Sequence, residues 1–427
     1  MPRAGWRHSI FVIVLVALLL RLTVITIGHT YRITPRRDHF QFGWEMGRIA
    51  RSIASGQGFS SPTDLLTGPS AWAPPVYPYI LAGVFKLFGS YSTASAWFIL
   101  IFNSIFSALT CWTLYEVAIR IYNETVARAT AWTWALFPYA IYWPVRIIWE
   151  MSLSAFLLSL ALLLALRMKE TSRMRDGILF GLLWGVIALT NTAILSLLPC
   201  FLVWLLDRAK MRECLVNIAA PFVVLAVVIT PWLVRNYVVF GKFVFIRDNL
   251  PLEMHMANND QSEGLWTRSE HPGNDPEAMR QFQELGEIRF MELKQQEVNQ
   301  FIREHPARFA GFTLQRAFYF WIGPPQANYV AGYDLRLARH IAFLLPALFA
   351  WAGLFLTMRD GNPARFLLAC LLIVYPLPYY LVNPFPRYKH AIEPEIILLA
   401  VYLFWRASQK QIFLKRQSRG SFRLPVL

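Results

Sequence analysis

Long apolar runs divide this chain of 427 residues, and several are long enough to cross a lipid bilayer. A spanning helix needs roughly 20 mostly apolar residues. Hydrophobic residues make up 56% of the chain and charged residues only 16%, too few to cover a soluble protein of this size. The sequence therefore predicts an all-α polytopic membrane protein with about ten spans, near residues 9–28, 96–117, 129–144, 148–166, 177–191, 193–206, 215–233, 339–357, 366–382 and 392–406.

Lys and Arg are distributed unevenly among the loops that join these spans. With the N-terminus in the cytoplasm, the inner segments carry nineteen Lys and Arg, and the short outer loops carry three. Basic residues accumulate on the cytoplasmic side of membrane proteins. We therefore expect both termini to be cytoplasmic in the inner (cytoplasmic) membrane, with a transmembrane catalytic unit over 1–410 and a basic tail over 411–427. Two long loops, 29–95 and 234–338, then face the outside, where we expect the active site.

Sequence motifs of several function classes are missing. The chain has no GxxxxGK[ST] loop, no HExxH and no CxxC. A cytosolic nucleotide sugar is therefore not the expected substrate, and nucleic acid is not an expected partner. No cofactor is predicted, although a divalent metal stays open.

The first outer loop begins with an amphipathic segment. In residues 38–58 (DHFQFGWEMGRIARSIASGQG), apolar residues recur every three or four positions, which predicts a helix on the outer leaflet. Asp38 is expected at its start, and the Gly56/Gly58 pair at its end. Two interpretations of Asp38 stay open at this point: a helix cap that accepts a backbone N–H, or a general base at the membrane surface. A second apolar segment, 76–90, is expected to lie at the surface or packed sideways.

Charged residues also stand at or near the outer ends of three spans. Glu150 lies at the outer end of span four, in RIIWEMS, where a charge is either solvated at the interface or functional. Arg387 and Lys389 lie directly before the last span, where they suit either an interfacial anchor or a phosphate site. Arg21 lies inside the first span, and we expect it to extend toward the outer surface, with a structural ion pair as the second choice.

The order of these elements resembles a known class of enzymes. It is similar to the GT-C membrane glycosyltransferases, in particular the family 39-like branch of protein O-mannosyltransferases and the lipid A aminoarabinose transferase. The likeness covers roughly 1–410 and rests on an ordered set of segments rather than on one motif. The segments are FGWEMGRIARSIASGQGF after Asp38, APPVYPYILAGVFKLFG (73–89), TPWLVRNYVVFGKF (230–243) and RYKHAIEP (387–394).

The resemblance implies a donor sugar carried on a polyprenyl phosphate, and an acceptor on a lipid, a glycan or a protein. The acceptor hydroxyl attacks the anomeric carbon in an inverting displacement. In this pattern Asp38 is the general base, and Glu150 orients the acceptor or pairs with Arg146. The expected donor-phosphate ligands are Arg387, Tyr388, Lys389, Arg235 and Lys86, and the residues expected at the acceptor-facing surface are Tyr77 and Arg48.

One departure from the family pattern concerns the phosphate site. Where the lipid A transferases have a Lys before the Pro/Tyr element, this chain has Ala71-Trp72-Ala73. Another cation must therefore take its place.

The second outer loop is expected to be helical over 276–304 and to carry an aromatic-rich interfacial segment over 308–323. We expect it to cover the cavity and to help select the acceptor. The alternative function is a transporter or flippase of a lipid-linked sugar. It would share the lipid groove and the cations, but it predicts functional polar groups near the bilayer midplane.

Overall fold

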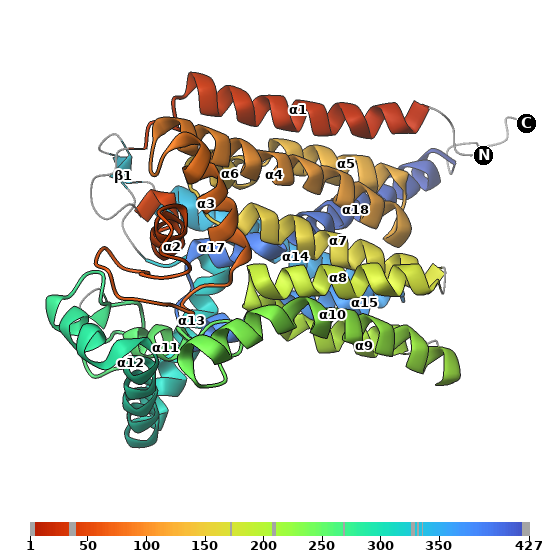
Figure 1. Cartoon of the computed structure of the whole chain (residues 1–427). Coiled ribbons are helices and arrows are strands. Elements are labelled where there is room, and N and C mark those ends of the chain that lie inside the picture. Colours follow the sequence, from red (N-terminus) through yellow and green to blue (C-terminus); the bar gives the residue numbers. More distant parts are fainter. Residues whose placement is uncertain are drawn as a thin grey trace, which may run out of the picture.

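The computed structural model describes residues 5–33, 40–170, 173–206, 211–267, 270–325, 329–330, 333–334 and 336–420. Its long helices lie side by side, roughly parallel, and the short helices of the two long loops gather at one end (Figure 1). The helices of the bundle are α1 (Gly5–Ile27), α4 (Thr93–Ile121), α5 (Glu124–Leu136), α6 (Pro138–Arg146), α7 (Met151–Glu170), α8 (Met174–Thr190), α9 (Leu198–Leu206), α10 (Met211–Phe240), α14 (Arg336–Arg359), α15 (Arg365–Ile373), α16 (Leu377–Leu381) and α18 (Glu393–Gly420).

The other elements belong to the loops or to short turns. They are η1 (Phe40–Phe42), α2 (Glu45–Ala54), α3 (Val76–Phe88), η2 (Thr192–Leu197), α11 (Leu250–Ala257), α12 (Pro276–Glu304), α13 (Pro306–Ile322), α17 (Pro386–Lys389), η4 (His390–Ile392) and the antiparallel pair β1 (Tyr329–Val330) and β2 (Tyr333–Asp334). The all-helical class predicted from the sequence is confirmed, apart from this two-residue pairing.

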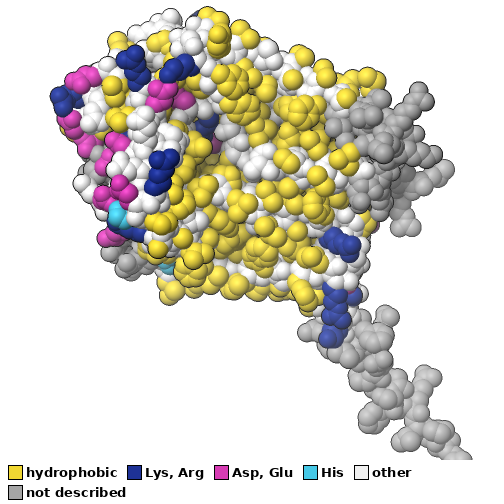
Figure 2. Space-filling model, turned by 90° about the horizontal axis from the view of Figure 1, so that it is seen from below, with side chains coloured by type: hydrophobic (Ala, Val, Ile, Leu, Met, Phe, Trp, Pro, Cys, Tyr) yellow, Lys and Arg dark blue, Asp and Glu magenta, His cyan; other side chains and the backbone are white. Residues whose placement is uncertain are grey.

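Five of the described helices are long and apolar enough to cross a membrane: α1, α4, α7, α10 and α14. The other predicted spans coincide with helices that are shorter, interrupted or more charged, so the number ten stays a prediction. The flank of the bundle presents a broad apolar surface, whereas charged side chains gather at the end that carries the loops (Figure 2). Such a large exposed apolar surface is the face that a bilayer covers.

Close packing inside the bundle depends on small residues. Gly353 of α14 lies against α18, and a Cβ added there would come within 2.1 Å of the Leu399 carbonyl oxygen. Gly181 of α8 has the same relation to α10, where the Pro221 oxygen would be 2.4 Å away. Small residues allow helix backbones to approach closely in a membrane, where van der Waals packing replaces the hydrophobic effect between helices.

Arg21 of α1 corrects one expectation from the sequence. Its side chain is buried and donates hydrogen bonds to the carbonyl oxygens of Ala135 (3.2 Å) and Ala140 (3.0 Å). The intrahelical partner of the Ala140 carbonyl would be the N–H of residue 144, which is proline and has none. Ala135 stands in the last turn of α5, where carbonyls also lack helical partners. Arg21 therefore satisfies the backbone at the α5–α6 break instead of extending to the outer surface, and it forms no ion pair with any described residue.

The amphipathic helix of the first outer loop also differs from the prediction. Helix α2 begins at Glu45, with Trp44 at its N-cap, so the expected start at Asp38 is wrong; Asp38 itself lies outside the described residues. The helix is packed into the protein rather than exposed along the leaflet, because six consecutive residues from Glu45 to Ala50 are buried. Arg48 illustrates this, since its Nε and Nη2 donate to Asp64 at 3.0 and 2.9 Å.

Candidate functional site

A small polar chamber lies where the first outer loop, the start of α7 and the second outer loop meet. Its volume is ≈ 60 Å³, roughly the room of two water molecules. Its wall combines three carboxylates, two guanidiniums and several aromatic rings. The lining residues are Glu45, Met46, Trp72, Ala73, Pro74, Trp149, Glu150, Thr190, Asn191, Arg247, Asn249, Glu253, Arg387 and Tyr388.

A wider and more apolar groove of ≈ 360 Å³ continues from this chamber. The two spaces share five lining residues, which therefore form the passage between them: Glu150, Asn191, Arg247, Glu253 and Tyr388. Beyond the passage the groove is bounded mainly by apolar side chains, among them Leu195, Phe245, Leu250, Pro378 and Val382. The two connected spaces thus differ in character, one polar and the other mainly apolar.

Arg387 is held in place by aromatic rings. Its guanidinium carbon lies 4.3 Å from the ring centroid of Trp149, 4.2 Å from that of Phe385 and 5.0 Å from that of Tyr388. Its Nη2 donates to Tyr388 Oη at 3.4 Å, but its buried Nε has no hydrogen-bond partner among the described residues. Stacking fixes the plane of the cation without using all of its donors. N–H donors of the Arg387 guanidinium therefore remain for a hydrogen bond to a ligand.

The charges around Arg387 keep it ionised. Burial alone would lower its pKa, but Tyr388, Glu253, Glu45 and Glu150 raise the pKa above its usual value. The guanidinium is therefore a permanent positive charge in the chamber.

The second guanidinium comes from the loop after α10. Arg247 Nε donates to Asn249 Oδ1 at 2.6 Å, and Asn249 Nδ2 donates to Glu253 Oε1 at 3.5 Å. Burial and the nearby Glu45 raise the pKa of Glu253, and its Oε2 has no hydrogen-bond partner among the described residues. This connected set places a cation and a carboxyl group together at the passage.

Glu150 stands directly before α7. Burial raises the pKa of its carboxyl to about 7, while Arg387 and Arg247 act in the opposite direction. Its Oε2 is buried and has no hydrogen-bond partner within the described parts of the chain. Near neutral pH this group exchanges a proton readily, which is the property required of a general acid or base.

Segment 71–73 is held against the chamber by the second outer loop. The Ala71 N–H donates to Glu287 Oε1 of α12 at 2.5 Å, and the Asp248 N–H donates to the Ala71 oxygen at 3.1 Å. Burial raises the pKa values of both carboxyl groups, that of Asp248 to about 6. Trp72 and Ala73 therefore form part of the wall, and the cations of the chamber come instead from Arg247 and Arg387.

The structure brings together three of the residues predicted for the site: Glu150, Arg387 and Tyr388. It places the other predicted cations elsewhere. Arg235 donates to the Ser70 and Phe59 carbonyl oxygens at 2.7 and 2.8 Å. Lys389 is buried and donates to the Phe343 oxygen at 2.8 Å, and Lys86 is exposed on α3. None of these three lines the chamber.

Two further expectations concern the acceptor-facing surface. Tyr77 is fully buried, and its hydroxyl donates to Asn103 Oδ1 at 3.0 Å. Arg48 is buried and paired with Asp64. Neither side chain lies at the surface, because Tyr77 pairs with Asn103 of α4 and Arg48 pairs with Asp64 of the first outer loop. The predicted base Asp38 lies outside the described residues.

Sequence reasoning missed Glu45, Arg247 and Glu253. Glu45 stands inside the amphipathic segment, where an acidic residue suits the solvated face of a helix. Arg247 and Glu253 stand in a polar stretch without a motif. The available signal was their position close behind the predicted outer end of span seven, where the segment 230–243 had already been singled out.

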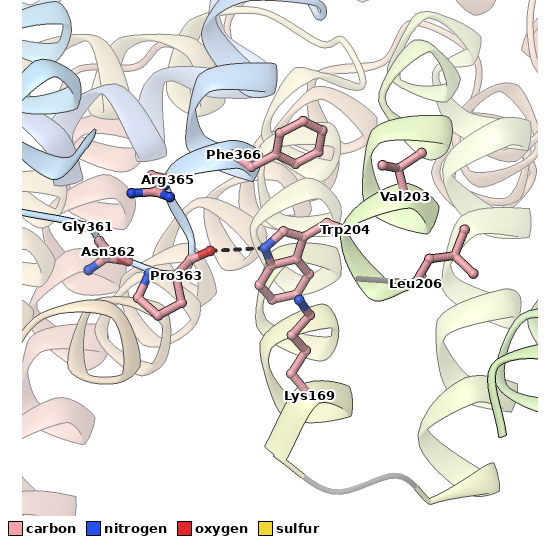
Figure 3. Close-up of a pocket in the computed structure, with 9 residues that line it drawn as sticks. All are labelled: Lys169, Val203, Trp204, Leu206, Gly361, Asn362, Pro363, Arg365 and Phe366. Atoms are coloured by element: carbon pink, nitrogen blue, oxygen red, sulfur yellow. Dashed lines mark hydrogen bonds between the residues drawn. The ribbon is translucent and has the colours of Figure 1, made fainter. Parts of the chain in front are cut away.

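A second cavity, of ≈ 700 Å³, lies between the ends of α7 and α9 and the segment 361–366 (Figure 3). The Trp204 indole N–H donates to the Pro363 oxygen at 3.1 Å, and Lys169 Nζ lies 3.8 Å from the centroid of the Trp204 ring. Lys169 belongs to the last turn of α7, whereas Glu150 precedes its first residue. A helix of 20 residues spans about 30 Å, so this cavity is remote from the chamber.

The fold is similar to that of GT-C membrane glycosyltransferases. The archaeal oligosaccharyltransferase AglB from Archaeoglobus fulgidus, in complex with an inhibitory peptide and a dolichol-phosphate, aligns with 100% of this chain at 13% identity and a TM-score of 0.59. The same organism's oligosaccharyltransferase in complex with Zn and sulfate aligns with 94% at 13% identity and a TM-score of 0.58. The chain covers 53% and 50% of those proteins, about half their length.

A family match agrees with this fold. Residues 73–234 match the family described as dolichyl-phosphate-mannose-protein mannosyltransferase. ArnT from Cupriavidus metallidurans, bound to undecaprenyl phosphate, aligns with 95% of this chain and 79% of its own at 15% identity and a TM-score of 0.41. A search of curated proteins gives no match. The resemblance expected from the sequence, to GT-C membrane glycosyltransferases of the protein O-mannosyltransferase branch, is confirmed.

Proposed function

We propose that this protein is a membrane glycosyltransferase that transfers a hexose or pentose from a polyprenyl-phosphate carrier to an acceptor hydroxyl on the periplasmic face. The observation that carries the proposal is the junction of the apolar groove and the polar chamber: Arg247, Glu150 and Glu253 stand at the passage, and Arg387 lines the chamber. An isoprenoid tail suits the groove, and a phosphate suits the two guanidiniums.

The leaving phosphate gains negative charge as its bond to the anomeric carbon breaks. A guanidinium fixed by aromatic rings stabilises this developing charge without reorganising, which lowers the barrier. Arg387 fits this role because its plane is set by Trp149 and Phe385. Arg247, at the passage, supplies the second positive charge.

The acceptor hydroxyl must lose its proton as it attacks. We assign this proton to Asp38 of the first outer loop, as the family resemblance implies, with inversion at the anomeric carbon. Glu150 is the second acid, and it orients the acceptor hydroxyl. Among the described residues no three His, Cys, Asp or Glu side chains are placed to hold a metal ion. The predicted absence of a cofactor, with a divalent metal left open, stays a prediction.

The test uses purified full-length protein in proteoliposomes that contain a polyprenyl-phosphate-linked radioactive hexose. An extract of cell-envelope material supplies the acceptor. We expect release of polyprenyl phosphate together with a new labelled product. Asp38→Asn and Arg387→Gln should each abolish this transfer, while Lys86→Gln, a change of an exposed cation outside the chamber, should leave it intact.

Undiminished transfer in Arg387→Gln would contradict the proposal. Movement of the intact labelled lipid across the bilayer, without cleavage of the sugar–phosphate bond, would favour the alternative of a transporter or flippase.

A further inference from the structure

Glu45 and His271 join the two outer loops at the wall of the polar chamber. His271 Nε2 lies 3.4 Å from Glu45 Oε1. The side chain of His271 is 1% exposed and that of Glu45 is 12% exposed. They stand in different loops, more than 200 positions apart in the chain, and neither takes part in the proposed transfer step.

The hydrogen bonds of His271 define which ring nitrogen carries the proton. Its Nδ1 accepts a hydrogen bond from the Gly273 N–H at 2.9 Å. In a neutral imidazole one nitrogen accepts and the other donates, so the proton of neutral His271 is on Nε2, which faces Glu45. This buried Nε2 makes no hydrogen bond in the described part of the chain, and the Glu45 carboxylate oxygen 3.4 Å away is the acidic group it faces.

Aromatic rings hold the imidazole in this orientation. The His271 ring stacks on Trp44, with centroids 4.4 Å apart and an interplanar angle of 24°, and meets the Trp72 ring edge-on at 5.5 Å. Trp44 is the residue before Glu45, so the same stacking fixes the start of α2. The Glu45 carboxylate is thus oriented by His271, a rigidly held residue of the second outer loop.

The position of Glu45 relative to the groove indicates what it meets. Glu45, Trp72, Trp149 and Arg387 line the chamber but not the groove, whereas Arg247 stands at the passage between them. A lipid-linked sugar with its tail in the groove and its phosphate at the passage places its sugar in the chamber. Carboxylates accept hydrogen bonds from hydroxyl groups, and aromatic faces give large contact area.

The wall of the chamber also has a donor without a partner. The indole Nε1 of Trp72 is buried and has no hydrogen-bond partner among the described residues, although the side chain is only 2% exposed. Leaving a buried donor unsatisfied costs free energy, so the proposed sugar would gain from placing an oxygen within reach of this indole N–H.

We propose that Glu45 binds a hydroxyl group of the donor sugar and that His271 is the positioning residue that orients this carboxylate. The proposal rests on the proposed function, because it assumes a lipid-phosphate-linked sugar in this chamber. The chamber is too narrow for a sugar in the present conformation, so binding also requires its side chains to move apart.

The experiment measures binding rather than turnover. Purified full-length protein in detergent is titrated with a polyprenyl phosphate that carries no sugar, and with the same lipid carrying glucose, mannose, galactose or a pentose. We expect the wild type to bind at least one sugar-bearing lipid about tenfold more tightly than the bare lipid. Glu45→Gln should reduce this preference to less than about threefold and leave the affinity for the bare lipid unchanged.

Two substitutions of His271 separate positioning from packing. His271→Phe keeps the stacked ring but removes the Nε2 donor, and it should lose the sugar preference as Glu45→Gln does. His271→Gln places an amide N–H near the same position and should restore at least half of the preference. Glu297→Gln is the matched control, because it makes the same change in α12 at a residue that does not line the chamber.

A sugar preference that survives in Glu45→Gln, or its absence from the wild type with every sugar tested, overturns this inference. So does a loss of bare-lipid binding in Glu45→Gln, which assigns the residue to folding. Failure of the proposed function looks different: the wild type then does not bind the bare lipid, or Arg387→Gln binds it as well as the wild type.

Discussion

Two regions of the molecule enclose an arginine, and they use it in opposite ways. At the break between α5 and α6, Arg21 makes four hydrogen bonds, to Ser107 and to the carbonyl oxygens of Ala17, Ala135 and Ala140. At the polar chamber, Arg387 is surrounded by rings and retains a buried Nε without a partner among the described residues. An arginine whose N–H donors are hydrogen-bonded to the protein supports the fold. An arginine with an N–H donor that has no protein partner is available to bind a ligand.

The largest effect that this comparison predicts is on Arg387. Arg387→Gln should lower transfer by about 10²–10³-fold, the cost of removing one preorganised stabiliser of developing charge. The thermal unfolding temperature in detergent should stay close to that of the wild type, because the only hydrogen bond that the side chain makes among the described residues is the long one to the neighbouring Tyr388 hydroxyl, at 3.4 Å. Turnover assays together with a melting curve check both parts. A large fall in melting temperature would instead assign Arg387 to the fold.

Arg21→Met is the opposite case. It leaves the carbonyls of Ala135 and Ala140 without their donors in the bundle, so the free energy of unfolding should fall by about 3 kcal/mol. The protein that remains folded should keep its activity per molecule. Unfolding curves and activity normalised to folded protein test this. Intact stability would show that the break at Pro138 does not need the guanidinium.

The third prediction concerns Glu150 and pH. Its pKa is raised from an ordinary value of 4.5 to about 7, so the folded state binds a proton more tightly than the unfolded state. Its contribution to stability is therefore fully present below about pH 4.5 and is lost as the pH rises toward 7. Compared with the wild type, Glu150→Gln should flatten the fall in stability over this window, by on the order of 2–3 kcal/mol.

Unfolding curves of both proteins between pH 4.5 and pH 7.5 measure that difference. Parallel curves for wild type and Glu150→Gln would contradict the assignment of a raised pKa to this carboxyl.

The smallest effect is expected at the rings that hold Arg387. Trp149→Leu removes one of three stacked faces and should weaken binding of bare polyprenyl phosphate about three- to tenfold, or about 1 kcal/mol. A matched change, Trp321→Leu, alters a ring near Lys389 that does not line the chamber, and it should leave lipid binding unchanged. Equal losses in both variants would mean that the effect is general destabilisation.

Part of the site could be predicted from the sequence, because its residues lie at the ends of apolar runs. Glu150 lies at the outer end of predicted span four, and Arg387 and Tyr388 directly precede predicted span ten, so their expected depth followed from hydropathy. Arg235 and Lys389 have equally suitable positions along the chain, but their side chains turn to backbone carbonyls of neighbouring segments. Hydropathy fixes how deep a residue lies and leaves its direction around the helix axis open.

The second outer loop was harder to interpret. The helix predicted over 276–304 corresponds to α12, yet the loop's contribution to the chamber comes from Arg247 and Glu253, far from that helix in the chain. No periodic pattern marks these two residues, because Arg247 lies in a loop and Glu253 lies in the short helix α11. Long-range packing brings both of them to the passage. Glu45 was overlooked for a similar reason, since a helix predicted to lie on the membrane turned out to be buried.

The sequence by itself determined the class of the protein, since apolar runs of this length leave few stable structures besides a helical bundle in a membrane. It also determined which residues stand at the ends of those helices. Only the tertiary structure decided which charged groups share one chamber and which are used up by the backbone. The physical reason is that a buried polar group takes whichever partner the packing brings within hydrogen-bond distance, and that partner comes from another part of the chain.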